Sequence, residues 1–180
     1  MSSRSGKVKT IQSKEATLTA LYEEYYNRIA RYAYVRIGNK TDAEDLAGEV
    51  FLKALQSLKS YNERGIPMQA WLFRIAHNLV VDYLRKKAKR KTVPIDAVQI
   101  ANGTDPAMIA EKNIEMERVT KAMEQLTRAQ REVLALRFFG GLTSQETGGI
   151  LKKSDGAVRE MQRAAIAKLR QLLSTDQQSS

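Results

Sequence analysis

Apolar residues recur at three- and four-residue steps along most of this chain, which is the period of an amphipathic helix. The first such stretch contains Leu18, Tyr25 and Ile29, and we expect it to end at Gly38. Thr41-x-x-Glu44 forms a capping box that predicts the start of a second helix. No segment alternates apolar and polar residues as a half-buried strand does. The pattern therefore predicts an all-α protein.

The expected helices fall into two groups. A third helix carries its apolar face from Leu72 to Tyr83. Residues 92–113 contain two prolines and Asn102-Gly103, so we expect a flexible linker there. Helical spacing then resumes with Met116, Val119, Met123 and Leu126, and it predicts three further helices near residues 129–138, 144–151 and 155–173. We expect two small helical domains, residues 16–91 and 114–175, with a disordered tail at residues 1–15 and a second tail at residues 176–180.

The last two expected helices are separated by a turn of only a few residues. Thr143-x-x-Glu146 can cap the first of them and Ser154 can cap the second. This is the layout of a helix-turn-helix, in which the second helix lies in the DNA major groove. The outer side of that helix carries Asp155, Arg159, Glu160 and Arg163, and arginine suits guanine whereas glutamate suits cytosine. The alternative is an amphipathic hairpin with a solvated charged face.

The composition favours a polyanionic partner. The 180 residues carry a formal net charge of +10, and 43% of them are hydrophobic, which is enough for packed cores. The absence of cysteine excludes disulfides and thiolate metal sites and suits a reducing cytosol. No apolar run is long enough to span a bilayer, and residues 1–14 lack the apolar centre of a secretory signal. We therefore expect a cytoplasmic protein without membrane insertion.

Two further charged segments are candidate binding surfaces. The basic run from Arg85 to Lys91 follows Trp71 and Phe73 on the third helix, and aromatic and basic residues together suit single-stranded DNA. In the alternative interpretation the aromatic residues belong to the core, and only the basic run binds. The acidic stretch from Asp42 to Glu49 is either a surface for a partner protein or an ordinary solvated helix start.

Catalytic chemistry finds no support in the sequence. His77 is the single histidine, and no nucleophile–base pair, phosphate-cradling glycine loop or metal-ligand cluster can be assembled. We therefore expect a protein that is not an enzyme and that needs neither a metal nor another cofactor.

Three stretches resemble bacterial RNA polymerase sigma factors of the extracytoplasmic-function (ECF) class. TDAEDLAGEVFLKAL (residues 41–55) and AWLFRIAHNLVVDYLRKK (residues 70–87) are similar to the domain that binds core polymerase and melts the promoter. LTRAQREVLALR (residues 126–137), together with the helix-turn-helix, resembles the C-terminal domain of these proteins. The short linker, with no third domain between the two, is typical of the ECF class.

The resemblance implies a role for each candidate residue. The second helix, with Asp42, Asp45, Leu46 and Glu49, would dock on the clamp helices of the polymerase's largest subunit. The loop at Tyr61 and Asn62 would hold a base flipped from the non-template strand. The minus-ten element would be read by the third helix, with His77, Asn78, Asp82, Arg85, Lys86 and Lys89. The minus-thirty-five element would be read by Thr143, Ser154, Asp155, Arg159, Glu160 and Arg163, while Arg137 would brace the phosphate backbone.

The chain departs from the family pattern at several positions. The family usually has glutamine at Gly48, and an apolar residue, alanine and a polar residue at positions 147–149. It usually has glycine where Lys152 stands in the turn, and often arginine where Ala164 stands in the recognition helix. Arg163 is adjacent and can supply the missing cation.

These observations lead to one functional prediction and two rivals. We expect a sigma factor that binds core RNA polymerase and directs promoter recognition, strand opening and transcription initiation. The resemblance also implies an inhibitory partner, an anti-sigma factor. The first rival is a free-standing helix-turn-helix regulator with an N-terminal dimerisation or sensing domain, which would recognise a palindromic site without polymerase. The second is an adaptor that binds only proteins through its acidic helix.

Overall fold

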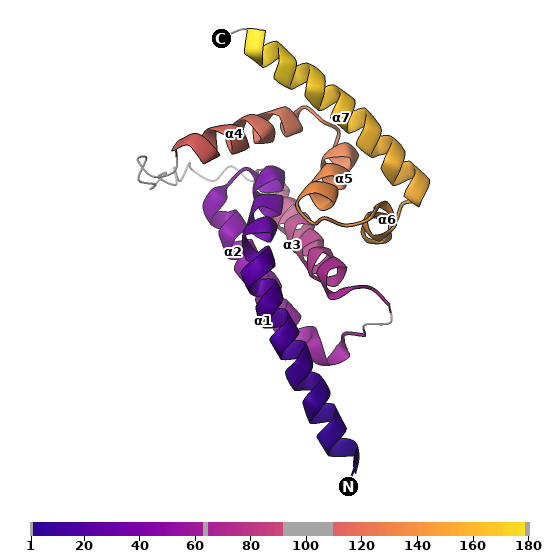
Figure 1. Ribbon diagram of the computed structural model, residues 1–180. Helices are drawn as coiled ribbons and strands as arrows, with labels where there is room; N and C mark the ends of the chain where they lie inside the picture. Colours follow the sequence, from indigo (N-terminus) through magenta and orange to yellow (C-terminus); the bar gives the residue numbers. More distant parts are fainter. Residues whose placement is uncertain (1, 63–64, 92–109, 179–180) are drawn as a thin grey trace.

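The computed structural model describes residues 2–62, 65–91 and 110–178, and these residues contain seven α-helices and no strand (Figure 1). The helices are α1 (Ser2–Ile37), α2 (Lys40–Ser57), α3 (Met68–Lys91), α4 (Ala110–Glu124), α5 (Arg128–Phe138), α6 (Ser144–Leu151) and α7 (Asp155–Gln178). A single 3-10 turn, Leu58–Ser60, follows α2. The predicted all-α class with two helical domains is confirmed. Most of the predicted linker, residues 92–109, lies outside the described residues.

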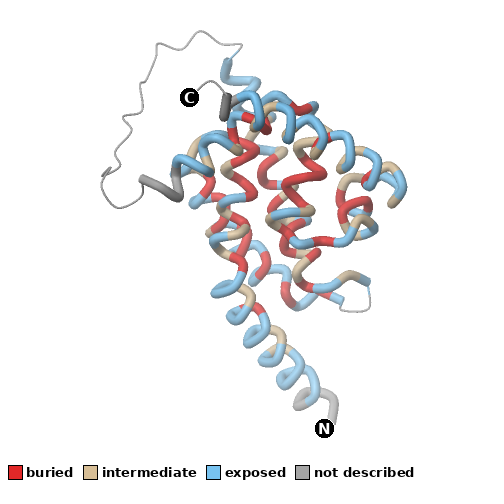
Figure 2. Tube along the Cα trace, turned by 45° about the horizontal axis from the view of Figure 1, so that its top comes forward, coloured by how far each residue is buried: buried red, intermediate tan, exposed pale blue. Residues whose placement is uncertain are grey.

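Helices α1, α2 and α3 form the N-terminal domain. Its centre contains Ile29, Tyr32, Leu72 and Phe73, all of which are fully buried. The rings of Tyr32 and Phe73 meet edge to face with their centroids 5.7 Å apart, which is a favoured aromatic geometry. The buried residues line the inner faces of the helices in both domains, as the apolar periodicity requires (Figure 2).

The N-terminal tail expected at residues 1–15 is wrong for the described residues, because α1 already begins at Ser2. The helix projects beyond the rest of the domain, and residues 6–10 on it are exposed (Figure 2). Ile11 and Lys14 are nevertheless half-buried, and Lys14 Nζ donates a hydrogen bond to the carbonyl oxygen of Tyr61 at 2.6 Å. Lys14 is thus held by a residue 47 positions further along the chain, although the sequence pattern alone assigned its segment to a tail. Likewise, residues 110–113 of the expected linker belong to α4, and residues 176–178 of the expected C-terminal tail belong to α7.

The start of α2 differs from the prediction by two residues. Gly38 ends α1 with φ +74°, as expected, and Asn39 rather than Thr41 then caps α2. The Asn39 side chain accepts a hydrogen bond from the backbone N–H of Asp42 at 2.9 Å. Asparagine is at least as good an N-cap as threonine. Asn39 therefore binds a backbone N–H group at the start of the helix, which would otherwise have no partner, and the helix begins at Lys40.

Helices α4 to α7 form the C-terminal domain, whose caps follow local rules. Thr127 with Gln130 forms a capping box on α5, and Thr143 with Glu146 forms the predicted one on α6. Ser154 Oγ accepts from the backbone N–H of Ala157 at 3.2 Å, as predicted for the start of α7. The bounds of α6 are those predicted from the sequence, because the capping box marks its start and the Ser154 cap of the next helix limits its end.

Two of the departures from the family pattern lie at the turn between α6 and α7. Lys152 adopts a left-handed conformation (φ +56°) at the position where the family usually has glycine. The chain then folds back so closely that a Cβ atom on Gly148 would lie 2.4 Å from the carbonyl oxygen of Lys153. Glycine at position 148 therefore permits the tight approach that this turn makes.

A buried hydroxyl in α6 yields the first testable prediction. Thr147 is fully buried, and no group in the described part of the chain hydrogen-bonds to its Oγ1 atom. An unpaired buried polar group costs roughly 1–3 kcal/mol, so Thr147→Val should raise the free energy of unfolding by about 1 kcal/mol in urea denaturation. The control is Thr143→Val, which removes a hydroxyl that caps α6 and should lower stability by about 1 kcal/mol. A loss of stability in both variants would contradict the assignment of an unpaired hydroxyl.

Candidate nucleic-acid interface

The N-terminal half of α7 presents a row of exposed charged side chains. The side chains of Arg159, Glu160 and Arg163 are 66%, 71% and 79% exposed. Each arginine is paired within its own helix, Arg159 with Asp155 and Arg163 with Glu160, the latter at 3.5 Å. Exposed pairs of this kind contribute little to stability, so both guanidinium groups can exchange their partners for base edges at small cost.

The start of α7 is held against α6 by polar contacts. Asp155 accepts a hydrogen bond from Ser144 Oγ of α6 as well as pairing with Arg159. Ser154 is occupied in capping, and Thr143 in the capping box of α6. In this structure Ser154 and Asp155 therefore fix the start of α7, beside the arginines that project from it, and Thr143 fixes the start of α6.

Arg137 lies inside the helix-turn-helix domain rather than on its rim. Its Nε donates to Gln162 Oε1 of α7 at 2.8 Å, and its Nη1 donates to the carbonyl oxygen of Leu142. The half-buried guanidinium thus connects α5, the turn before α6 and the recognition helix. A phosphate contact of Arg137 stays a prediction, and in this structure the residue positions α7 through Gln162.

The C-terminal part of α3 carries the second charged surface. Asn78, Asp82, Arg85, Lys86 and Lys89 are all exposed, and Arg85 pairs with Asp82 at 3.3 Å. Their spacing places several cations along one exposed length of helix, where they can follow a phosphate backbone. The aromatic residues nearby are mainly structural, since Phe73 is fully buried and Trp71 is half-buried.

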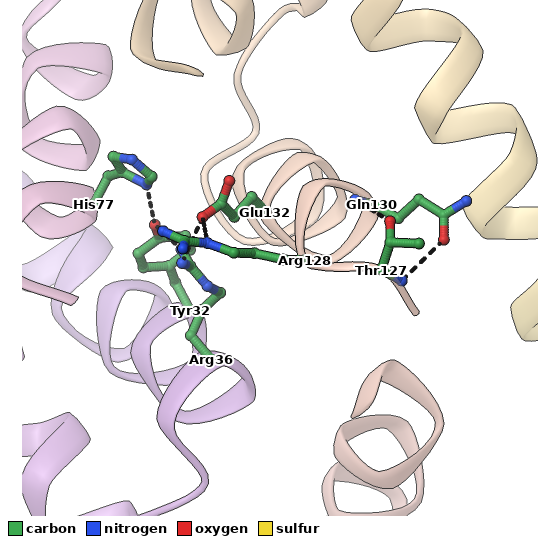
Figure 3. A network of polar contacts seen from close by, with 7 residues as sticks. All are labelled: Tyr32, Arg36, His77, Thr127, Arg128, Gln130 and Glu132. Atoms are coloured by element: carbon green, nitrogen blue, oxygen red, sulfur yellow. Dashed lines mark hydrogen bonds and ion pairs between the residues drawn. The ribbon is translucent and has the colours of Figure 1, made fainter. Parts of the chain in front are cut away.

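His77 is turned away from the exposed charges of α3. Its Nδ1 atom lies 3.3 Å from the hydroxyl of Tyr32 on α1. Burial, together with the nearby cations Arg36 of α1 and Arg128 of α5, lowers the pKa of His77 to about 4, against the opposing effect of Glu132 (Figure 3). The ring is therefore neutral near pH 7 and belongs to a packed interface in this structure, a position that a helical pattern alone did not indicate.

The pKa of His77 predicts a specific pH dependence. An unfolded histidine titrates near pH 6.5, so as the pH falls from about 6.5 to 4 the unfolded chain takes up the proton first. The free energy of unfolding should therefore decrease over this range, by about 1–2 kcal/mol more in the native chain than in the His77→Gln variant. Urea denaturation of both proteins at several pH values measures this difference in the free energy of unfolding. Both proteins have the same carboxylates, so the effect of carboxylate titration cancels in the comparison. Parallel pH profiles would contradict the low pKa.

The loop before α3 is braced from inside. Tyr61 is buried, its hydroxyl donates to the carbonyl oxygen of Ile66 at 2.7 Å, and its ring packs on Trp71 with centroids 4.8 Å apart. Asn62 is exposed, whereas residues 63–64 lie outside the described part. Tyr61 thus shapes the loop in this structure, and Asn62 is the better placed of the two predicted residues to meet a base.

The exposed side of α2 that carries the acidic residues also carries two exposed leucines, which were not predicted from the sequence. Asp45 and Glu49 are exposed as expected, and Leu52 and Leu55, which are 61% and 52% exposed, lie three and six residues beyond Glu49. Leu46, in contrast, is only 9% exposed and packs in the core. The signal was present in the sequence, because both leucines fall outside the buried stripe at helical spacing.

Asp42 faces inward more than the other acidic residues of α2. Its carboxylate accepts a hydrogen bond from the Tyr83 hydroxyl at 2.5 Å, which ties α2 to α3. Burial, with the adjacent Asp42 carboxylate, raises the pKa of Tyr83 to about 12. The exposed face of α2 that remains for a partner is therefore formed by Asp45, Glu49, Leu52 and Leu55, and we call it the α2 face.

Comparison with known proteins matches the two domains separately. Residues 21–90 match the family described as Sigma-70 region 2, and residues 122–171 match Sigma-70, region 4. The ECF RNA polymerase sigma factor SigD of Mycobacterium tuberculosis is 31% identical over 148 residues, covering 79% of this chain and 70% of SigD. The chain belongs to the ECF RNA polymerase sigma factors. The resemblance noted from the sequence is thereby confirmed.

A second relative of this sigma factor is longer. The ECF RNA polymerase sigma factor BldN of Streptomyces coelicolor is 32% identical over 160 residues, which are 87% of this chain and 60% of BldN. The present chain thus spans somewhat over half of that relative's length. Region 2 covers α1 from residue 21 onward, α2 and nearly all of α3, and region 4 covers the end of α4 through most of α7. The first half of α1 lies outside both matches.

Two solved structures share the fold of this sigma factor. CnrH, in complex with the cytosolic domain of CnrY, matches with a TM-score of 0.69 and 23% identity, covering 94% of this chain and 96% of CnrH. The sigma factor RpoE of Bartonella quintana, in complex with the anti-sigma factor NepR, matches with a TM-score of 0.67 and 22% identity, covering 88% and 97%. At these identities the likeness concerns the fold.

The described residues hold neither a metal cluster nor a membrane span. No group of three or more histidine, cysteine, aspartate or glutamate side chains is placed there to bind a metal ion. None of the helices described is long and apolar enough to cross a bilayer.

Proposed function

We propose that this ECF sigma factor binds core RNA polymerase and directs promoter recognition, strand opening and transcription initiation. The observation that carries the proposal is the match of region 2 and region 4 to two separate domains, each of which presents its own exposed charged surface. A free-standing regulator needs only one such surface, and an adaptor needs neither. The chain is then a specificity subunit, and bond formation belongs to the polymerase.

Each surface has one role in the proposed mechanism. The α2 face docks on the clamp helices of the polymerase's largest subunit, with Leu52 and Leu55 as apolar contacts and Asp45 and Glu49 as acidic ones. The exposed residues of α3 and the loop at Asn62 bind the minus-ten element, and a base captured from the separated strands offsets part of the unpairing cost of a few kcal/mol.

The recognition helix binds the minus-thirty-five element. Arg159, Glu160 and Arg163 meet base edges there, and Arg137 holds the helix in register through Gln162. Each domain alone binds promoter DNA weakly. When the polymerase holds both domains, binding of one domain to its promoter element raises the effective concentration of the other domain at the second element. Much of the affinity comes from phosphate contacts, so promoter binding weakens steeply with added salt.

We also propose an inhibitory partner protein and a cellular compartment for this chain. Because RpoE of Bartonella quintana was solved with an anti-sigma factor, we propose an inhibitory protein of that class for this chain. A protein that works on polymerase and DNA belongs in the bacterial cytoplasm, which agrees with a chain free of cysteine.

Run-off transcription with purified core polymerase on a library of DNA fragments tests the proposal. We expect promoter-specific transcripts only when both the core enzyme and this chain are present, with little specific DNA binding by the chain alone. Specific binding to a palindromic site without polymerase would favour the regulator instead. Failure to co-elute with core polymerase would overturn the proposed function.

A further inference from the structure

The first half of α1 holds the loop that precedes α3. Lys14 Nζ donates a hydrogen bond to the carbonyl oxygen of Tyr61 at 2.6 Å, and the same atom lies 5.6 Å from the centroid of the Tyr61 ring. The hydrogen bond is charge-assisted, and a cation within roughly 6 Å of an aromatic centroid is attracted to the ring. One ammonium group therefore holds both the backbone and the side chain of Tyr61.

Tyr61 connects this contact to the rest of the loop. Its backbone N–H donates to the carbonyl oxygen of Leu58 at 3.3 Å, which closes the 3-10 turn after α2. Its hydroxyl reaches the carbonyl oxygen of Ile66 at the far end of the loop, and its ring packs on Trp71 of α3. Because Tyr61 is only 7% exposed, a shift of this residue would disturb the turn, the loop and α3 together. Lys14 thus acts on the residue that organises the loop.

Lys14 lies on a packed face of α1 that begins before the region 2 match. Ile11 and Lys14 are half-buried and Leu18 is buried, at the three- and four-residue spacing of one helix face. A partly buried lysine needs an acceptor for its ammonium group, and the Tyr61 carbonyl oxygen is that acceptor here. The match to region 2 begins at residue 21, so this contact is made by a part of the chain that the family match does not include.

The peptide group that Lys14 binds is the one that joins Tyr61 to Asn62. This group is planar, so its orientation sets the direction of the following residue, and Asn62 is exposed. The backbone N–H of Gly65 donates to the Asn62 carbonyl oxygen at 3.2 Å, so the peptide groups on both sides of Asn62 are held. Ordering a loop costs conformational entropy, and a loop that is already held therefore binds a base more tightly.

We propose that Lys14 is a positioning residue for base capture, which fixes the Tyr61–Asn62 peptide group so that the loop is ready to hold a base flipped from the non-template strand. This inference rests on the proposed function and adds to it a residue outside the region 2 match. Lys14 acts through Tyr61, so it sets the strength and the base preference of capture, whereas the α2 face sets the affinity for core polymerase.

The single tryptophan of the chain reports on the loop without any partner. Trp71 packs on the Tyr61 ring, so its fluorescence follows the position of Tyr61 in the free chain. Lys14→Met keeps an apolar stem that favours helix and removes the cation. Acrylamide should quench Trp71 about twofold more efficiently in this variant, because loss of the contact lets the loop open locally. Lys14→Arg keeps a cationic donor and should be quenched as the native chain is.

Promoter opening shows whether the held loop matters for base capture. Each full-length variant is bound to core polymerase and mixed with a promoter returned by run-off selection, randomised on the non-template strand of its minus-ten element. Permanganate reactivity of unpaired thymines then measures the open complex. We expect Lys14→Met to form open complexes about tenfold less efficiently and to discriminate less between bases, with Lys14→Arg restoring both. The Kd for core polymerase should be the same for all of these proteins.

A matched substitution controls for the loss of charge. Lys9→Met removes the same charge from an exposed position of the same helix, and it should quench, open promoters and discriminate between bases as the native chain does. Circular dichroism should be native for all three variants, because the buried face of α1 from Leu18 onward is unchanged. An equal loss of opening in Lys9→Met would show a general effect of charge and overturn the positioning role.

The remaining outcomes separate this inference from the proposed function. Native quenching of Trp71 in Lys14→Met overturns the positioning role, and so does native opening with native base preference in that variant. A loss that Lys14→Arg fails to restore also counts against it. If the native chain never binds core polymerase, the proposed function is refuted, whereas stronger quenching in free Lys14→Met still shows that Lys14 holds the loop.

Discussion

Reversing both exposed charges of the recognition helix, with Arg159→Glu and Arg163→Glu, should reduce promoter-specific initiation by a factor of roughly 100 or more. A good arginine contact to guanine contributes about 1–3 kcal/mol of discrimination, and two are lost together while repulsion from phosphates is added. The side chains are 66% and 79% exposed, so the fold should be unaffected. Run-off transcription with saturating core polymerase measures the effect.

A matched pair of substitutions controls for the change in net charge. Lys121→Glu and Arg170→Glu alter the charge by the same amount at exposed positions of the same domain, away from the start of α7. Initiation with this control should stay within a few-fold of the native value. If the Arg159→Glu, Arg163→Glu protein initiates as well as the control, α7 does not read the promoter.

The second large effect is expected at the α2 face. Replacing Leu52 and Leu55 by glutamate should raise the Kd for core polymerase at least tenfold. Burying an aliphatic side chain in full contributes about 1.5–3 kcal/mol. About half of each leucine side chain is already buried in the free chain, so each contributes part of that amount on binding. Glutamate favours helix about as well as leucine, so α2 should persist. Competition against a labelled sigma factor for core enzyme gives the change in Kd.

Two exposed apolar residues outside the α2 face serve as the comparison. Val8 of α1 and Ile114 of α4 are 52% and 56% exposed, and their replacement by glutamate changes charge and hydrophobicity comparably. This variant should bind core polymerase normally. Equal affinities for the two variants, with native circular dichroism in both, would show that the polymerase docks elsewhere.

Helix positions were predictable where local chemistry decides them. The bounds of α6 follow from the capping box of Thr143 and Glu146 at one end and from Ser154, which caps the next helix, at the other. The start of α2 was predicted two residues late because Asn39 and Thr41 are both competent caps, and the sequence does not say which one the chain uses. The exposed arginines of α7 were predictable for a similar reason, since helical spacing separates them from buried Val158.

Contacts between distant residues were not predictable in this way. Lys14 was assigned to a tail, and its sequence gives no sign of the bond to the Tyr61 carbonyl oxygen. His77 was assigned to the minus-ten element, and its sequence gives no sign that the Tyr32 hydroxyl lies beside it. Leu46 carried the periodicity of the core and was still assigned to a partner through family resemblance, whereas the structure buries it and exposes Leu52 and Leu55 on the same helix.

The sequence by itself determined the helices, the division into two domains and the residues on the recognition helix, because periodicity and caps act over a few residues. Only the tertiary structure decided that Arg36 meets Glu132 and that His77 faces the domain interface. Charged residues 96 positions apart carry no local sign of pairing. Their attraction depends on how two domains exclude water between them, which is a property of packing rather than of helical period.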